Sequence, residues 1–141
     1  MLLGEYKHSI DKKGRMFIPA KLREDLGESF VISKGIDQKP CLCIYSVDEW
    51  NELDEKIRRL PTMKAGKLRR FLYSGANKIE CDAQGRALIP QNLREYADLT
   101  AEATILGMSN HLEIWNSDLW IRESEQYTSE SIAEIVEELD F

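Results

Sequence analysis

The feature that most constrains the fold of this chain is an internal repeat. Two blocks, Asp11–Glu24 and Asp82–Glu95, share 8 identities in 14 positions without a gap, and both read Asp-x-x-Gly-Arg followed by Ile-Pro and Leu-Arg-Glu. A second pair of blocks, Leu42–Trp50 and Leu112–Trp120, follows in the same order. Two matches in one order indicate duplication of a small unit. Each unit is too small to build a full core alone, so we expect the two to pack together or to associate with other copies.

Each repeat begins with a predicted turn between two strands. Asp11 occupies the first turn position, where its carboxylate accepts a backbone N–H, and Gly14 supplies the positive φ that closes the turn. Asp82 and Gly85 repeat this pattern. We therefore expect two β-hairpins, in which the strands on either side of each turn pair with each other. The segments expected to pair are 6–10 with 15–18, and 78–81 with 86–89.

The rest of each unit is predicted to form a short helix, two strands and a closing helix. Proline after the second strand favours a helix start, and Ser46 begins a capping box. The expected short helices span 20–26 and 91–97, the strands 30–33, 42–45, 104–106 and 112–115, and the closing helices 46–59 and 116–125. Trp50 and Trp120 occupy equivalent positions in the closing helices, so we interpret both as core anchors rather than as platforms for stacking bases.

The expected organisation is two domains and two further segments. We predict a first domain over 1–60, a basic linker helix over 61–75, a second domain over 76–126 and an acidic C-terminal helix over 127–141. In the linker, Leu68, Phe71 and Leu72 are expected to form one apolar helical face. In the C-terminal helix, apolar residues from Ile132 to Leu139 recur at helical spacing beside glutamates. We expect this stripe to pack on its own domain or on a neighbouring chain, with partner binding as the alternative.

Charge is distributed unevenly along the chain. The net charge is −6, but residues 1–78 carry 16 Lys/Arg and 11 Asp/Glu, whereas residues 79–141 carry 3 and 14. The first part therefore has a net charge of +5 and the second of −11, an asymmetry typical of contact with a polyanion or of an interaction tail. An acidic, solvated tail beside an ordinary surface explains the same numbers, so charge alone leaves both interpretations open.

The sequence predicts a protein that stays inside the cell. Its apolar runs are much shorter than the roughly 20 residues that span a bilayer, and Glu5 comes too early for a signal peptide. The three cysteines, Cys41, Cys43 and Cys81, form no CxxC pair, which argues against a disulfide framework and suits a reducing cytoplasm.

The repeated Asp-x-x-Gly-Arg turn, with Ile-Pro and Leu-Arg after it, resembles the SpoVT-AbrB domain, and two such domains in a chain of this length resemble the MraZ family. Leu3–Tyr6 and His111–Trp115 also match that family's pattern. The resemblance implies a mainly β fold with short helices (α+β). Two tandem AbrB-like swapped-hairpin units would form one pseudo-dimeric β-barrel, followed by C-terminal helices.

The same resemblance implies a function and an assembly. The protein would be a transcriptional regulator that binds repeated boxes in double-stranded DNA upstream of its own gene, at the head of a cluster for cell division and cell-wall synthesis. It would form a closed homo-oligomeric ring, an octamer or a dodecamer, and would lie in the cytoplasm in association with the nucleoid.

Cationic side chains at the first turn are the predicted DNA contacts. Lys12, Lys13 and Arg15 lie at a hairpin tip narrow enough to enter the major groove. Nearby in the sequence are Lys7, Lys21 and Arg23. Lysine and arginine neutralise phosphates, and the arginine fork also matches the edge of guanine. The alternative is that Arg15 merely pairs with Asp11 while the lysines keep an edge hairpin soluble.

The second turn is expected to contribute less to DNA contact. The resemblance carries the role of Arg15 over to Arg86, but Ala83 and Gln84 replace the two lysines of the first turn. The second repeat also lies in the part of the chain with net charge −11. We therefore predict that the first turn carries most of the DNA contact and that the second mainly builds the barrel.

Enzymatic and metal-dependent functions find little support in the sequence. No nucleophile has a base at a useful spacing, and the only histidines are His8 and His111. Cys41 and Cys43 would share one strand face, but their counterparts in the second repeat are His111 and Glu113, whereas a duplicated metal site would reuse its ligands. We therefore predict no enzyme activity, no metal, no cofactor and no small-molecule substrate.

One other function class stays open, an AbrB-like antitoxin or protein-binding adaptor that acts through the acidic tail. The duplication argues against it, because such antitoxins usually carry one domain and a disordered tail.

Overall fold

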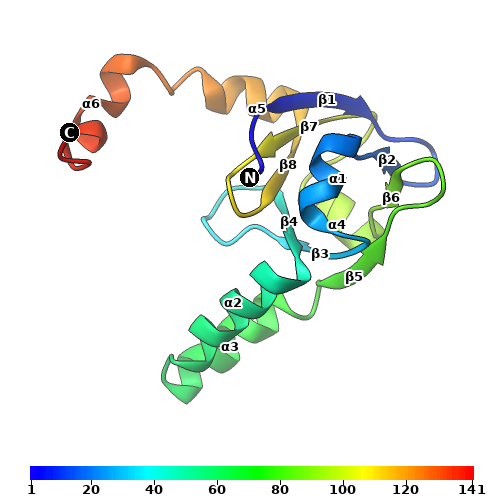
Figure 1. Cartoon of the computed structure of the whole chain (residues 1–141), viewed down its shortest axis with the longest axis horizontal. Helices are drawn as coiled ribbons and strands as arrows, with labels where there is room; N and C mark the ends of the chain where they lie inside the picture. The colour runs from blue at the N-terminus through cyan, green and yellow to red at the C-terminus, as the bar shows by residue number, and fades with distance from the viewer.

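The chain folds into a mixed α/β structure in which every strand pairing is antiparallel (Figure 1). The computed structural model describes all of residues 1–141. In chain order the elements are β1 (Glu5–Ser9), β2 (Arg15–Phe17), α1 (Ala20–Leu26), β3 (Ser29–Lys34), β4 (Leu42–Ser46), α2 (Val47–Arg58), α3 (Thr62–Leu72), β5 (Asn77–Glu80), β6 (Arg86–Leu88), α4 (Gln91–Tyr96), β7 (Glu102–Gly107), β8 (Leu112–Asn116), α5 (Ser117–Ser124) and α6 (Ser129–Glu137). Helices contain more residues than strands, so the expectation of a mainly β fold is wrong, although strands and helices are combined as expected. The helices α2, α3 and α6 account for the difference.

The strands form two sheets, and the larger one mixes the two repeats. It has six strands in the order β1-β7-β8-β4-β3-β5, while β2 and β6 form a separate ladder of two. β1 of the first repeat pairs with β7 of the second, and β5 of the second pairs with β3 of the first. Each repeat therefore supplies an edge strand to the other. The six-stranded sheet is open, with β1 and β5 at its edges, and closure into a swapped-hairpin barrel stays a prediction.

The expected pairing within each hairpin is wrong. Across the two turns only the isolated bridges Ile10–Met16 and Cys81–Ala87 form. The three-residue strands β2 and β6 pair with each other instead, which places Met16 and Ala87 at 0% exposure. The turns reverse the chain as expected, but a longer ladder is available on the opposite repeat: β1 forms five residue pairs with β7. The larger number of backbone hydrogen bonds and the buried side chains favour that partner.

A single main core joins the two repeats. It contains 19 buried residues, which come from both turn ladders, from α1 and α4, and from one face of the central strands. Leu42 and Ile44 of β4 and Leu112 and Ile114 of β8 all belong to it. Because side chains alternate along a strand, the residues between them point to the opposite face of the sheet. That opposite face is also buried, since β4 and β8 are covered on both sides.

The helices confirm most of the predicted boundaries. α1 spans the expected residues, and Pro19 and Pro90 precede α1 and α4. The side chain of Ser46 accepts a hydrogen bond from the backbone N–H of Glu49 at the start of α2, and Asn116 caps α5 in the same way. Trp50 and Trp120 are half-buried and pack at the edges of two small satellite clusters, so they anchor these clusters and not the main core.

The linker residues form α3, which packs antiparallel to α2 as a projecting helical hairpin (Figure 1). Leu68 and Leu72 contribute to the small cluster between the two helices. Phe71 does not join them: it lies 6.3 Å from the ring of Tyr96 and beneath the ammonium group of Lys34. The prediction that Leu68, Phe71 and Leu72 share one apolar face is therefore wrong for Phe71, because the helix places this residue toward α4 of the second repeat.

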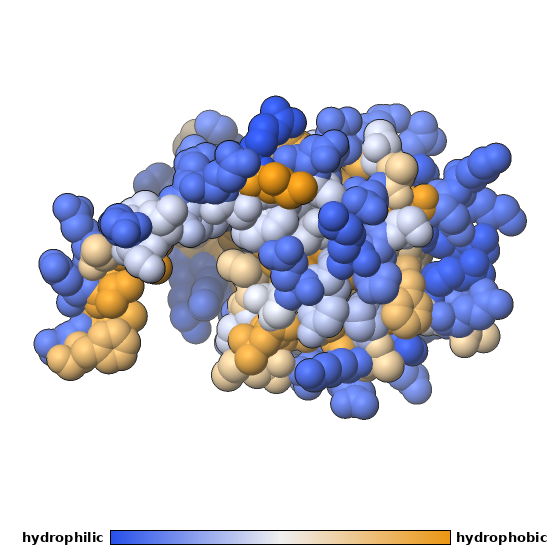
Figure 2. Space-filling model, turned by 90° about the horizontal axis from the view of Figure 1, so that it is seen from above, coloured by the Kyte–Doolittle hydropathy of each residue, from blue (hydrophilic) through white to orange (hydrophobic).

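The C-terminal helix α6 projects away from the rest of the molecule (Figure 1). None of its residues is buried: Ile135 is 62% exposed, and Leu139, just beyond the end of the helix, is 64% exposed. Figure 2 shows this uncovered apolar surface in orange on the projecting arm. Packing of the stripe on its own domain is therefore wrong, and packing on a neighbouring chain or partner stays a prediction. No helix in the chain has both the length and the apolar character needed to cross a membrane.

Candidate nucleic-acid interface

The two repeated turns lie at opposite ends of the small β2–β6 ladder. Arg15 pairs in register with Leu88, and Arg86 with Phe17. Side chains alternate along a strand, and Met16 and Ala87 face the core. The side chains of the other four residues, Arg15, Phe17, Arg86 and Leu88, therefore point outward on one face. The topology therefore places the arginines of both repeats on one small surface, which we call the ribbon face.

The first turn is held by its aspartate. One carboxylate oxygen of Asp11 accepts hydrogen bonds from the backbone N–H groups of Lys13 and Arg15, both at 2.9 Å. The other accepts the Nε–H of Arg15 at 2.7 Å. Gly14 closes the turn with φ +88° and donates its N–H to the carbonyl oxygen of Asp11 at 3.0 Å. Asp11 and Gly14 thus close this turn from its two ends.

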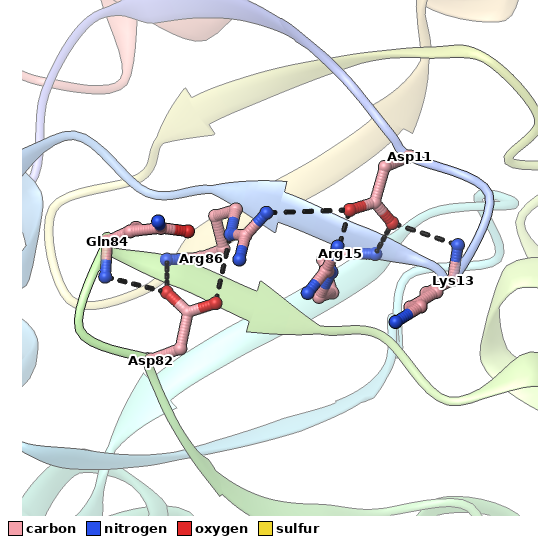
Figure 3. A network of polar contacts seen from close by, with 6 residues as sticks. All are labelled: Asp11, Lys13, Arg15, Asp82, Gln84 and Arg86. Carbon is pink, nitrogen blue, oxygen red and sulfur yellow. Dashed lines mark hydrogen bonds and ion pairs between the residues drawn. The ribbon is translucent and has the colours of Figure 1, made fainter.

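The second turn repeats this geometry almost atom for atom (Figure 3). Asp82 accepts the N–H groups of Gln84 and Arg86 at 2.9 Å, and the Nε–H of Arg86 at 2.9 Å. Gly85 closes the turn at φ +80°. One further contact joins the two motifs: Nη1 of Arg86 lies 3.9 Å from the carboxylate of Asp11. The two guanidinium groups consequently lie side by side.

These hydrogen bonds keep both aspartates ionised. The backbone N–H of Arg15 is the main cause that lowers the pKa of Asp11, and the backbone N–H of Arg86 does the same for Asp82. In each turn the arginine side chain lowers the aspartate pKa further. An ionised carboxylate orients each arginine through Nε. The Nη groups of Arg15 make no hydrogen bond within the chain, and Arg86 has only the longer contact with Asp11.

Each turn is locked by the opposite repeat. The backbone N–H of Ile18 donates to the carbonyl oxygen of Gly85, and that of Ile89 to Gly14, both at 2.9 Å. Arg94 lies directly over Gly14: a Cβ atom there would come within 2.7 Å of its guanidinium group. Arg23 covers Gly85 in the same manner, with a corresponding distance of 3.0 Å.

Sequence reasoning missed the role of these two covering arginines. Each donates its Nε–H to a backbone carbonyl in its own repeat, Arg23 to Ile18 and Arg94 to Ile89, both at 2.9 Å. The available signal was the identical Leu-Arg-Glu in both repeats. On a helix that triplet is also typical of an ordinary solvated face, so the pattern alone did not single them out.

Not all of the predicted contact residues lie on the ribbon face. Lys12 and Lys13 are exposed at the first turn and form no ion pair, and Ala83 and Gln84 occupy the same places in the second. Lys7 lies instead on the edge strand β1, 3.6 Å from the carboxylate of Glu102. The turns, with the two covering arginines, hold six cationic side chains and two carboxylates, which gives this region a local net charge of +4.

The acidic C-terminal segment is distant from this surface. In Figure 1, α6 lies at the opposite end of the molecule from the β2–β6 ladder, and Figure 2 shows the ladder's end as mostly hydrophilic. A charge separated by much more than the Debye length of about 8 Å is largely screened. The net charge of the second part of the chain therefore overstates the negative potential at the second turn, because the acidic residues of α6 contribute little there.

A comparison with known protein families matches the chain twice, at residues 1–69 and 72–140, to the family described as "MraZ protein, putative antitoxin-like". The chain belongs to the MraZ family. The two matches coincide with the two copies of the turn motif, so the duplication inferred from the sequence is confirmed. Membership places the chain among regulatory or antitoxin-like proteins.

Proposed function

We propose that this MraZ-family protein is a sequence-specific DNA-binding transcriptional regulator that contacts double-stranded DNA through the ribbon face. The observation that carries the proposal is the convergence of both Asp-x-x-Gly-Arg turns on one surface, with Arg15 and Arg86 held side by side by ionised aspartates. A guanidinium anchored through Nε still presents its Nη donors, the atoms that bind phosphate or the O6 and N7 atoms of guanine. Lys12 and Lys13 add unpaired positive charge beside them.

The proposal includes assembly and target. The exchange of edge strands between the repeats supports a pseudo-dimeric, swapped-hairpin unit. One such unit offers few phosphate contacts, so useful affinity requires several units that face adjacent boxes. A closed homo-oligomeric ring, bound to repeated boxes upstream of the protein's own gene at the head of a cell-division and cell-wall gene cluster, meets that requirement and brings the protein to the nucleoid.

The test is a fluorescence-anisotropy titration with a duplex taken from immediately upstream of the gene and a scrambled duplex of equal length. Affinity for the upstream duplex should exceed that for the scrambled one and should fall by about 10³-fold between about 50 and 200 mM salt if roughly six phosphates are contacted. Replacing Lys12 and Lys13 together with alanine should reduce the salt slope by about two.

The matched control replaces Lys64 and Lys67 with alanine. Both are exposed on α3, which projects away from the ribbon face. This control should bind DNA like the wild type. Equal affinity for the two duplexes, or an equal loss in the control, would contradict the proposal.

A second candidate function is that of an antitoxin or protein-binding adaptor, and the observation that favours it is the uncovered apolar stripe of α6. An adaptor would require α6 to engage a partner protein. Removing residues 127–141 should then abolish co-purification of that partner while DNA affinity per assembled ring is unchanged. Absence of a co-purifying protein, together with specific DNA binding, favours the regulator.

A further inference from the structure

The outer face of the β4–β8 ladder carries a buried cluster of metal-ligating side chains. Cys43 and Glu113 are register partners at the centre of this ladder, between the core pairs Leu42–Ile114 and Ile44–Leu112. The thiols of Cys41 and Cys43 and a carboxylate oxygen of Glu113 all lie within 4.8 Å of one another. Cys41 is 0%, Cys43 3% and Glu113 7% exposed. Three such groups, this close and this buried, resemble a ligand set more than a solvated surface.

The cluster combines residues from both repeats in one site. Cys41 and Cys43 of the first repeat correspond to His111 and Glu113 of the second. The sequence argument against a metal assumed that each repeat would build its own site and reuse its ligands. Because β4 pairs with β8, Cys41, Cys43 and Glu113 instead meet across one ladder and offer two sulfurs and one carboxylate. The imidazole of His111 lies beside them, stacked on Tyr45 of β4.

His111 is prepared as a fourth ligand. Its Nδ1 lies 2.7 Å from the amide oxygen of Asn110, and because that oxygen only accepts hydrogen bonds, Nδ1 must carry the proton. Nε2 then keeps its lone pair. The ring also stacks on Tyr45 of β4 at 5.2 Å between ring centroids. A second hydrogen bond that fixes the tautomer and the ring orientation is a common feature of metal-ligating histidines.

The carboxylate of Glu113 has no positively charged partner in the chain. Its only hydrogen bond is from the indole N–H of Trp115 at 2.9 Å, and no lysine or arginine forms an ion pair with it. A buried carboxylate without a compensating charge is costly. Lys39, on the adjacent loop, is paired with Glu123 at 3.0 Å instead. A bound divalent cation would supply the missing charge.

We propose that Cys41, Cys43, Glu113 and His111 form a binding site for a divalent transition metal, with Zn²⁺ as the preferred ion. Two sulfurs with one nitrogen and one oxygen ligand suit the tetrahedral geometry of zinc, whereas magnesium and calcium prefer oxygen ligands alone. Binding releases the two thiol protons to solvent for each ion bound. The site lies on the opposite side of the sheet from the main core, and it ties the loop before Cys41 and the turn before His111 to the central ladder.

The probe is Co²⁺ added to the reduced, chelator-treated full-length protein, because thiolate ligation gives cobalt a near-ultraviolet charge-transfer band and tetrahedral geometry gives it strong visible bands. We expect both signals to saturate at one ion per chain, Zn²⁺ to displace Co²⁺ completely, and Zn²⁺ to raise the Tm. Cys43→Ser should lower the intensity of the charge-transfer band per bound cobalt, because one of the two thiolates is removed, and should weaken binding by more than the about 10–100-fold typical of losing an outer-shell partner.

Cys81→Ser is the matched control, because this half-buried thiol lies at the end of β5 and outside the cluster. It should bind like the wild type. Glu113→Gln provides a second variant with the same shape, which should weaken binding without loss of folding, as monitored by circular dichroism. The proposal is overturned if the wild type gives no tetrahedral cobalt spectrum, if Cys81→Ser loses it equally, or if the reduced cysteines take up no metal and instead close a Cys41–Cys43 disulfide on exposure to air. No DNA is present, so the outcome is independent of the regulatory function.

Discussion

Replacing Gly14 with alanine should destabilise the protein, although the change adds only a single methyl group to a turn. The residue has φ +88°, a conformation that costs an L-residue about 1–2 kcal/mol. The new Cβ would also lie 2.7 Å from the guanidinium group of Arg94, so that side chain must move. Moving it breaks its hydrogen bond to the carbonyl oxygen of Ile89, worth about 1 kcal/mol. The expected loss is about 2–3 kcal/mol, or a Tm lowered by about 6–10 °C.

The assay is urea and thermal unfolding followed by circular dichroism, at one protein concentration for all variants. Gly66→Ala is the matched control, because this glycine lies inside α3 without positive φ and an added Cβ would make an ordinary 3.5 Å contact with Arg70. This control should gain about 1 kcal/mol from helix propensity. A lower free energy of unfolding for Gly14→Ala and a higher one for Gly66→Ala would support the reasoning. A Gly14→Ala variant within about 0.5 kcal/mol of the wild type would refute it, since that is the usual range for an unconstrained surface position.

Three further outcomes are expected. Arg15→Ala should weaken DNA binding by about 1–3 kcal/mol per engaged subunit, and Arg86→Ala should weaken it less, because only the first turn carries Lys12 and Lys13. Fluorescence anisotropy measures both affinities, on variants that keep the wild-type assembly. A larger loss of affinity for Arg86→Ala than for Arg15→Ala would contradict this ranking. Light scattering should give the mass of many chains, and a monomer at micromolar concentration would disprove ring assembly. The pKa of Asp11 is lower in the folded than in the unfolded chain, whose value is about 3.9, so its stabilisation is present above that pH and is lost as the pH falls toward the folded pKa. Urea unfolding between pH 7 and pH 3 should therefore show a flatter pH dependence for Asp11→Asn than for the wild type, and parallel curves would contradict the assignment.

Local features of the fold were predictable because they depend on neighbouring residues. The turn at Asp11 and Gly14, the helix that follows Pro19 and the cap at Ser46 each follow from the chemistry of a few adjacent positions. Strand partners were not predictable in this way. Nothing in the sequence of β1 shows whether it pairs with β2 or with β7. Either strand could accept and donate its backbone hydrogen bonds, and both lie beside the same core.

The same limit applies to the candidate sites. Arg15 and Lys12 could be identified as turn residues, but their proximity to Arg86 depends on the pairing of β2 with β6. The metal-ligating cluster was dismissed for the same reason, since Cys43 and Glu113 are distant in sequence and meet only because β4 pairs with β8. Internal duplication adds a particular difficulty: equivalent residues suggest two equal sites, whereas a pseudo-twofold arrangement can merge them into one.

The exchange of edge strands sets the order in which the newly made chain can fold. Residue 5 pairs with residue 106, so β1 leaves the ribosome about a hundred residues before its partner exists. During synthesis the first repeat has an unpaired edge on both sides, because β5 also arrives late. Such non-local pairing is slow and exposes strand edges to other nascent chains. The α2–α3 hairpin, formed from adjacent segments, is able to fold at once, and α2 would then pack on β3 and β4 while the second repeat is translated.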